Sequence, residues 1–371
     1  MEKNTFTEKE IYRQPGLWLT VFEILVEQKM SIQQFLEPII KKEDLRIILT
    51  GAGSSSFIGE AAQGVIQKKV GRVVQAISTT DIVTHADLFL SLEVPTLLVS
   101  FARSGDSPES LEVFYLAEKL CKEVYHLIIT CNKEGKLITD TSVVGESCYK
   151  LILPEEANDE SLAMTGSFTS MLLCALIVWD MKNIESNRKS VEGIISIGYV
   201  ILKQSNLLKT VIKKKIERVV FLGSGPMTGI ARECQLKLQE LTNGKIICKH
   251  DSFLGFRHGP RVIVNKNTLI VFLFSADKHV CLYERDLARS ISNDPGVISV
   301  FFNSPEDLNL VSGISIGDGM VDGNNMQIIP ATLIGQLLGL YKSLQLGLNP
   351  DNPSINGAIN RVVQGVTIYR K

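Results

Sequence analysis

The 371-residue chain lacks an excess of charge of either sign: 39 Lys and Arg residues stand against 40 Asp and Glu residues, a formal net charge of −1. Proteins that bind nucleic acid or anionic lipid carry a strong basic balance or patch, so neither partner is expected. The chain also lacks a long hydrophobic run. The longest, residues 168–179, is shorter than the roughly 20 residues that cross a bilayer. We expect a buried helix there and no membrane partner.

Paired cysteine motifs and nucleotide motifs are missing as well. The seven cysteines are scattered, with no CxxC pair, and residues 1–14 are charged and polar rather than a secretory signal. This pattern predicts reduced thiols and a cytoplasmic location, and neither disulfides nor a metal site. The stretch GAGSSS lacks the third glycine of GxGxxG, and GxxxxGK[ST] does not occur, so dinucleotide and P-loop binding have no support. No cofactor is expected.

What the sequence does contain is an internal repeat. Residues 44–62 resemble residues 217–233, about 172 positions later, and each reads as an apolar strand, a Gly-Ser turn and a helix. Further pairs follow at similar spacing: a strand and then a turn over residues 94–107 and 267–278, and strands over 124–130 and 297–303 and over 150–154 and 326–330. An apolar helix is expected to close each half, over 168–179 and about 331–345.

The strands of both halves are continuous apolar runs, which indicates burial on both faces. Strands that alternate with helices form parallel βαβ units. We therefore predict an α/β fold of two tandem, doubly wound, flavodoxin-like domains. The expected boundaries are an N-terminal helical segment over 1–44, a phosphate-binding domain over 45–200, a catalytic domain over 201–347, and a tail over 348–371 that closes the active site.

Two serine-rich turns follow predicted strands of the first half, GAGSSS at 51–56 and SFARSGDS at 100–107. In such sheets ligands bind beyond the carboxyl ends of the strands. Small residues let backbone N–H groups converge on an anion, hydroxyls add donors, and a helix N-terminus adds its dipole. Either turn alone could be an ordinary polar turn, but two turns favour a phosphate site. The second half has lost the pattern, since SADK at 275–278 replaces SGDS.

The second half offers ionisable groups instead. Glu233, Lys237 and Glu240 fall at i, i+4 and i+7 of a predicted helix, so they form one stripe. Such stripes are commonly solvent-exposed or purely structural ion pairs. Here apolar residues flank the stripe on both sides, which favours the lining of a cleft. His258 lies on a predicted turn, and its pKa range suits a general acid–base; a turn histidine that only packs is the alternative.

These segments resemble the sugar isomerase (SIS) domain family of phosphosugar-binding proteins over nearly the whole chain, as a tandem pair. ARECQLKLQELT followed by FRHGP is similar to the isomerase half of glucosamine-6-phosphate synthase. The opening TEKEIYRQPGLW and the closing NPSINGAINRVVQGVTIY look closest to the galactosamine-6-phosphate deaminase/isomerase branch, also labelled tagatose-6-phosphate ketose/aldose isomerase. That branch implies an enzyme of amino-sugar catabolism that converts galactosamine 6-phosphate to tagatose 6-phosphate and ammonia, a hydrolytic deamination.

The resemblance also implies residue roles. Glu240 would move a proton between C1 and C2 of the open-chain sugar, His258 would reach over from a partner subunit to open the ring, and Glu233 and Lys237 would complete the lining. A shared histidine implies a homodimer or larger assembly. The implied substrate contacts are Ser54, Ser55, Arg103, Ser104, Gly105 and Ser107 at the phosphate, and Thr165 near the sugar. The family's C-terminal lysine corresponds to Gln364, which cannot titrate; Arg361, one helical turn away, could supply charge instead.

Two alternatives remain open at this point. A ketose/aldose isomerase of neutral sugar phosphates would use the same base and differs in releasing no ammonia. A non-catalytic sugar-phosphate sensor would need the serine turns but neither Glu240 nor His258. Their joint presence favours an enzyme.

Overall fold

A computed structural model describes residues 5–292, 294, 296–305, 308, 313–317, 325–363 and 365–369. Its contacts divide the chain into two compact units, and neither is continuous in sequence. The first-sheet unit comprises Leu17–Asp159, Gly166–Arg188 and Ile359–Lys371, and the second-sheet unit comprises Met1–Gly16, Glu160–Thr165 and Lys189–Ala358. The domain boundaries expected from the sequence stay a prediction, because a division by spatial contacts does not test a division by internal repeat.

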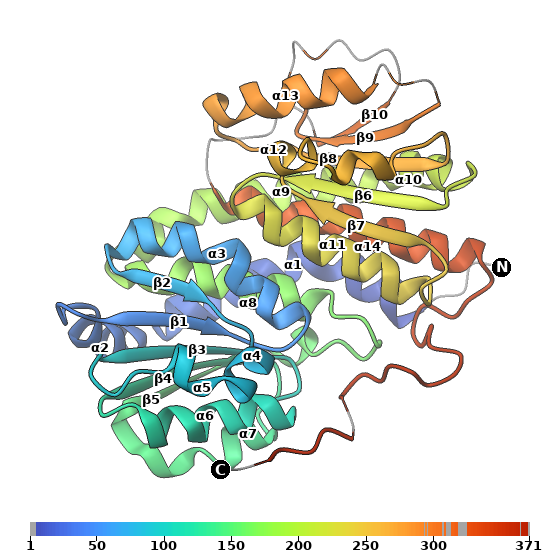
Figure 1. Ribbon diagram of the computed structural model, residues 1–371. Helices are drawn as coiled ribbons and strands as arrows, with labels where there is room; N and C mark the ends of the chain where they lie inside the picture. The colour runs from blue at the N-terminus through green and yellow to red at the C-terminus, as the bar shows by residue number, and fades with distance from the viewer. Residues whose placement is uncertain are drawn as a thin grey trace. The chain divides into compact units, whose positions relative to one another are not determined.

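The first-sheet unit holds five parallel strands in the order β2-β1-β3-β4-β5 (Figure 1). Their bounds are β1 Arg46–Thr50, β2 Val73–Ala76, β3 Thr96–Ala102, β4 Val124–Thr130 and β5 Cys148–Ile152. Every residue of β3 is buried, as the continuous apolar run predicts.

The second-sheet unit repeats this arrangement with β7-β6-β8-β9-β10, also all parallel. The strands are β6 Arg218–Gly223, β7 Ile247–Asp251, β8 Thr268–Leu273, β9 Ile298–Phe302 and β10 Ile314–Ile316. Arg46 lies opposite Thr96 in one sheet, and Arg218 lies opposite Thr268 in the other, so the two registers coincide at an offset of 172 residues. The flavodoxin-like strand order and the tandem α/β fold are confirmed.

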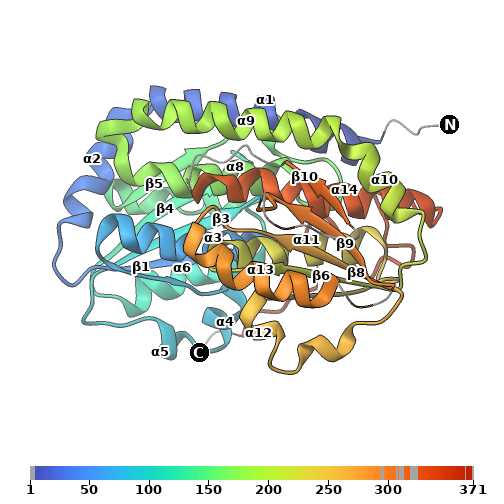
Figure 2. The ribbon, with the colours of Figure 1, turned by 90° about the horizontal axis from the view of Figure 1, so that it is seen from above.

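Helices cover both faces of each sheet (Figure 1 and Figure 2). On the second sheet, α11 packs on one face and α14 packs against α11, whereas α12 and α13 contribute to the phenylalanine-rich core of the other face. The helices are α1 Phe6–Glu27, α2 Lys29–Ile40, α3 Ser54–Val70, α4 Thr79–Thr84, α5 Ala86–Phe89, α6 Pro108–Leu120, α7 Lys136–Thr139, α8 Gly166–Ile177, α9 Arg188–Lys203, α10 Ser205–Ile212, α11 Pro226–Leu241, α12 Phe253–Phe256, α13 Lys278–Ser292 and α14 Ile328–Gln345. Short 3₁₀ segments are η1 Ser142–Ser147, η2 Glu155–Ala157, η3 Val178–Asn187, η4 Pro260–Ile263 and η5 Asn325–Gln327.

One expected strand is wrong. Residues 326–330 form the end of η5 and the first turn of α14, and the last strand of the second sheet is β10. A short apolar run cannot distinguish a strand from a buried helix, and Pro330 sits in the first turn of α14, where a helix tolerates proline. The expected helix over 168–179 is confirmed by the fully buried α8. Among the described residues, no helix is long and apolar enough to cross a membrane.

The contact between α11 and α14 depends on Gly335. A Cβ at this position would lie 2.4 Å from the Cβ and 2.6 Å from the Cα of Cys234. The absent side chain therefore sets how closely α14 approaches the helix that carries the ionic stripe.

Gly335→Ala should lower the free energy of unfolding by about 1–3 kcal/mol, the usual cost of overpacking a core. Gly193→Ala on α9 is the matched control, because no atom lies within 4 Å of the added Cβ. Alanine in an open helical position gains about 0.5–1 kcal/mol over glycine. Urea denaturation of both variants gives the comparison. A Gly335→Ala protein as stable as Gly193→Ala would contradict this packing account.

Candidate active site

The turn after β1 brings the start of α3 directly to the carboxyl end of this strand. Gly53 has a φ of 56°, a left-handed conformation that suits glycine, and a Cβ on Gly51 would lie 2.6 Å from the Cβ of Ser55. These two glycines let the chain turn sharply between strand and helix. Ser54 and Ser55 consequently lie buried in the first turn of α3.

The turn after β3 is equally constrained. Gly105 has a φ of 72°, and a Cβ on Gly135 would lie 2.4 Å from the carbonyl oxygen of Ser104. Asn132 donates to that same oxygen at 2.8 Å. The Ser107 hydroxyl caps α6 by accepting from the Ser110 amide at 3.3 Å. The loop that carries Ser104 is therefore held by the neighbouring loop after β4.

Both turns lie at one edge of the sheet. β1 and β3 are neighbouring strands, and Thr50 pairs with Ser100 near their carboxyl ends. This is the point where the strand order reverses, which is where ligands bind in doubly wound sheets. Two helix N-termini with serine hydroxyls face this edge, a chemical environment that suits an anion.

A cationic cluster completes the first-sheet part of the site. The buried Arg103 guanidinium donates to the carbonyl oxygen of Arg361 at 2.5 Å. Arg361 donates in turn to the carbonyl oxygen of Asp159 at 2.8 Å and to Oδ1 of Asn158 at 2.7 Å. Gln364 lies outside the described residues. Arg103 and Arg361, which are 258 positions apart in the sequence, are therefore in direct contact.

The pKa of the buried Cys131 thiol depends on the charged groups of this cluster. Burial raises the pKa of Cys131 well above its usual value, the Asp159 carboxylate raises it further, and Arg103 and Arg361 lower it. Two guanidinium groups and one carboxylate therefore lie close enough to shift the pKa of the same buried thiol.

Two of the three residues of the ionic stripe on α11 are buried, and whether the stripe lines a ligand cleft stays a prediction. Lys237 Nζ lies 2.6 Å from Oε2 of Glu240 and 3.5 Å from Oε1 of Glu233. The side chains of Glu233 and Lys237 are 0% and 1% exposed, whereas that of Glu240 is 21% exposed. Glu240 is thus the member of this trio (Glu233, Lys237 and Glu240) that can meet a ligand.

The remaining predicted residues lie on two other segments of the second-sheet unit. His258 lies on the exposed turn that follows α12. The Ser252 hydroxyl caps this short helix by accepting from the Gly255 amide. Thr165 is fully buried at the end of the segment Glu160–Thr165. Neither residue belongs to the trio on α11.

No family model matches the chain. Curated proteins do: the D-galactosamine-6-phosphate deaminase AgaS of Shewanella sp. (strain ANA-3) is 39% identical over 368 residues, which cover 98% of this chain and 92% of that protein. The protein of the same name from Escherichia coli is 35% identical over 98% of this chain and 96% of its own. This chain belongs to the AgaS family.

Solved structures agree with the AgaS assignment. A putative tagatose-6-phosphate ketose/aldose isomerase from Clostridium novyi superimposes with a TM-score of 0.93 at 38% identity, over 99% of this chain and 95% of that one. The C-terminal domain of glucosamine-fructose-6-phosphate aminotransferase from Francisella tularensis has a TM-score of 0.77 at 21% identity, over 95% and 99% of the two chains, and shares the fold. The predicted membership of the SIS group is confirmed.

In the second repeat of this AgaS-family chain, a carboxylate binds the turn after β8, and the sequence pattern did not indicate this contact. Glu284 on α13 is buried and accepts from the backbone amide of Ser275 at 2.9 Å. Burial raises the pKa of Glu284, and its hydrogen bonds to Ser275, Ser224 and Cys281 partly offset that effect. The turn after β8 therefore holds an acceptor supplied by the chain itself.

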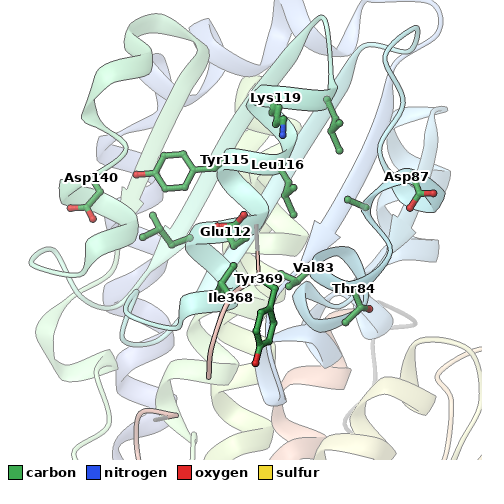
Figure 3. A pocket seen from close by; sticks show the side chains of 13 residues that line it. Val83, Thr84, Asp87, Glu112, Tyr115, Leu116, Lys119, Asp140, Ile368 and Tyr369 are labelled. Atoms are coloured by element: carbon green, nitrogen blue, oxygen red, sulfur yellow. The ribbon is translucent and has the colours of Figure 1, made fainter. Parts of the chain in front are cut away.

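The structure also contains a cavity of about 740 Å³ beside α6 in the first-sheet unit. Figure 3 shows its lining by Glu112, Tyr115 and Lys119 of α6, with Val83 of α4 and Tyr369 of the tail. None of the predicted site residues lines it. Across the described ranges, no cluster of three or more His, Cys, Asp or Glu side chains could hold a metal ion.

Glu284→Gln should become progressively more stable than the parent protein as pH rises from about 4.3, the unfolded-state pKa of a glutamate, through the raised folded-state pKa. The folded-state pKa of Glu284 is raised above its unfolded value of about 4.3, so the parent loses stability as pH rises through the folded pKa, whereas glutamine does not titrate. Urea midpoints across this range measure the difference. Glu27→Gln, at an exposed position of α1, is the control. A difference that is flat or falls with pH would contradict the burial argument.

Proposed function

We propose that the chain is a deaminating aldose/ketose isomerase that converts galactosamine 6-phosphate into tagatose 6-phosphate and ammonia. The observation that carries this proposal is a buried carboxylate–ammonium–carboxylate trio in a phosphosugar-isomerase fold. Near full-length similarity to proteins named D-galactosamine-6-phosphate deaminase supports the choice of substrate.

The turns after β1 and β3 would hold the 6-phosphate. Ser54 and Ser55 bring the start of α3, Ser104, Gly105 and Ser107 bring the start of α6, and Arg103 supplies charge from the buried cluster. Hydroxyls, backbone amides and guanidinium groups are strong partners for phosphate oxygens. None of these groups needs to react, so this half of the site contributes binding and orientation.

The trio on α11 would carry the proton transfer. His258 protonates the ring oxygen and opens the sugar. Glu240 removes the proton from C2; the C–H electron pair forms a C1=C2 bond, and O1 takes up a proton. Glu240 then returns a proton to C1 while the amino nitrogen loses one, which leaves a C2=N imine. Water adds to C2 and ammonia leaves, giving the ketose.

The geometry supports Glu240 rather than Glu233 as the base. Glu233 and Lys237 are buried, and Lys237 donates to Oε2 of Glu240 at 2.6 Å. The ammonium group fixes the carboxylate in one orientation, and Glu233 in turn accompanies the ammonium. Glu233 and Lys237 would hold the base, and Glu240 would meet the substrate.

Two further points belong to the same proposal. His258 is exposed on its turn, which suits a group donated to the site of a partner subunit in a homodimer. All seven cysteines are free thiols, and burial raises the pKa of Cys148 to about 11, which suits a reducing cytoplasm.

The wild-type protein, offered galactosamine 6-phosphate, should release ammonia and ketose phosphate in equal amounts. Glu240→Gln should lower kcat by about 10²–10⁴-fold, the range for loss of a general acid–base. Glu192→Gln on α9, an exposed glutamate, should leave kcat unchanged. Ketose without ammonia would indicate a simple isomerase, and neither product from any hexosamine 6-phosphate would indicate a sensor. Full turnover by Glu240→Gln would contradict the assigned base.

Ser104→Ala should raise KM for the sugar phosphate about tenfold while kcat changes little, because a lost phosphate contact weakens binding of ground state and transition state alike. Steady-state kinetics separate the two constants. Ser31→Ala, at an exposed position on α2, controls for the substitution itself. A KM equal to that of the control would count against the phosphate role.

A further inference from the structure

A buried glutamate on α1 holds the start of the segment that leads to Thr165. Glu10 is 2% exposed, and its Oε1 accepts from the amides of Glu160 at 2.6 Å and Ser161 at 3.2 Å. Its Oε2 accepts from the hydroxyl of Ser161. A residue near the N-terminus thus takes three hydrogen bonds from a loop 150 residues away.

A second buried carboxylate holds the other end of the same stretch of sequence. Asp159 accepts from the amide of Gly166 at 3.0 Å, and from the amide and hydroxyl of Ser167 at 2.9 and 2.6 Å. Each carboxylate, Glu10 and Asp159, therefore binds two backbone amides and one serine hydroxyl. The residues between the two sets of bonds are 162–165.

The energetic cost of these carboxylates indicates that they have a specific role. Removing an ion from water costs several kcal/mol, and strong donors must replace the lost hydration. Charge-assisted bonds to backbone amides do so only if the loop keeps one conformation. Asp159 also caps α8, whereas Glu10 lies inside α1 and accepts three hydrogen bonds from the loop.

Asp351 links the start of α1 to the segment Glu160–Thr165. Its carboxylate accepts from the amides of Phe6 at 3.1 Å and Thr7 at 2.8 Å, at the start of α1. Its carbonyl oxygen accepts from the amide of Leu162 at 3.0 Å. The helix that carries Glu10 and the loop that Glu10 binds thus share a third anchor.

We infer that Glu10 and Asp159 are positioning residues that fix the backbone of residues 160–167, and with it the position of the buried Thr165. This inference rests on the proposed function and on the sugar contact that the family resemblance implies for Thr165. Neither carboxylate touches the substrate; both act through the backbone of residues 160–167.

Glu10→Gln tests the first clamp with little change in size. Glutamine keeps one acceptor oxygen, but its NH₂ group cannot accept from the remaining donors. Hydrogen exchange of the amides of Glu160 and Ser161 should accelerate at least tenfold, while exchange in β1 and β6 stays at the parental rate. Glu27→Gln, the same substitution at an exposed position of α1, should leave exchange unchanged. Unchanged exchange in Glu10→Gln would overturn the inference.

A double-mutant cycle with Thr165→Val shows whether the clamp acts through this residue. Glu10→Gln should lower kcat/KM at least tenfold in the parent but less than threefold in Thr165→Val. The inhibition constant of inorganic phosphate should stay the same in all variants. Asp159→Asn should show the same coupling.

If the effects of Glu10→Gln and Thr165→Val on kcat/KM multiply independently, the carboxylates have only a structural role, and the inference is overturned. If the wild-type protein releases no ammonia, the proposed function fails on its own. The cycle is then measured on the affinity for galactosamine 6-phosphate, and the exchange result still decides whether the carboxylates hold the segment.

Discussion

The rest of the site depends on one interaction, the pairing of the Lys237 ammonium with two carboxylates inside the protein. Glu233 and Lys237 have essentially no exposure, so each is tolerated only because the other is present. Breaking such a pair typically costs about 3–5 kcal/mol. The arrangement requires α11 to be packed closely on all sides, and the missing side chain at Gly335 allows α14 to make that contact. Glu240, the proposed base, is held at the edge of this buried pair by its ion pair with Lys237.

The two repeats place different side chains on the same framework of strands and turns. Both sheets have the same strand order and the same tight glycine turn, with Gly53 at a φ of 56° and Gly225 at 55°. In the first repeat, serine hydroxyls lie at the starts of α3 and α6. In the second, the Glu284 carboxylate on α13 accepts from the Ser275 amide in the turn after β8, and the helix that follows Gly225 carries the ionisable trio. The proposed function accordingly assigns the phosphate to the first repeat only.

Local patterns predicted much of this structure. Continuous apolar runs predicted parallel buried strands, and the helical spacing of Glu233, Lys237 and Glu240 predicted that the three side chains share one stripe of a helix. The misassigned strand at 326–330 shows the limit, since a short apolar run takes its conformation from its neighbours. The roles of Glu10, Asp159 and Glu284 could not be predicted, because each depends on a partner that only the tertiary fold brings close. For Glu10 that partner lies 150 positions away.

The central claim is that a carboxylate on α11 removes the hydrogen at C2 of the sugar before the amine leaves. Galactosamine 6-phosphate with deuterium at C2 tests this directly when the products of the wild-type protein are followed by NMR. The account predicts that Glu240→Gln slows the loss of deuterium from C2 and the release of ammonia by the same large factor, about 10²–10⁴-fold, while both stay at the wild-type rate in Glu192→Gln. Loss of deuterium from C2 at the wild-type rate in Glu240→Gln would contradict it.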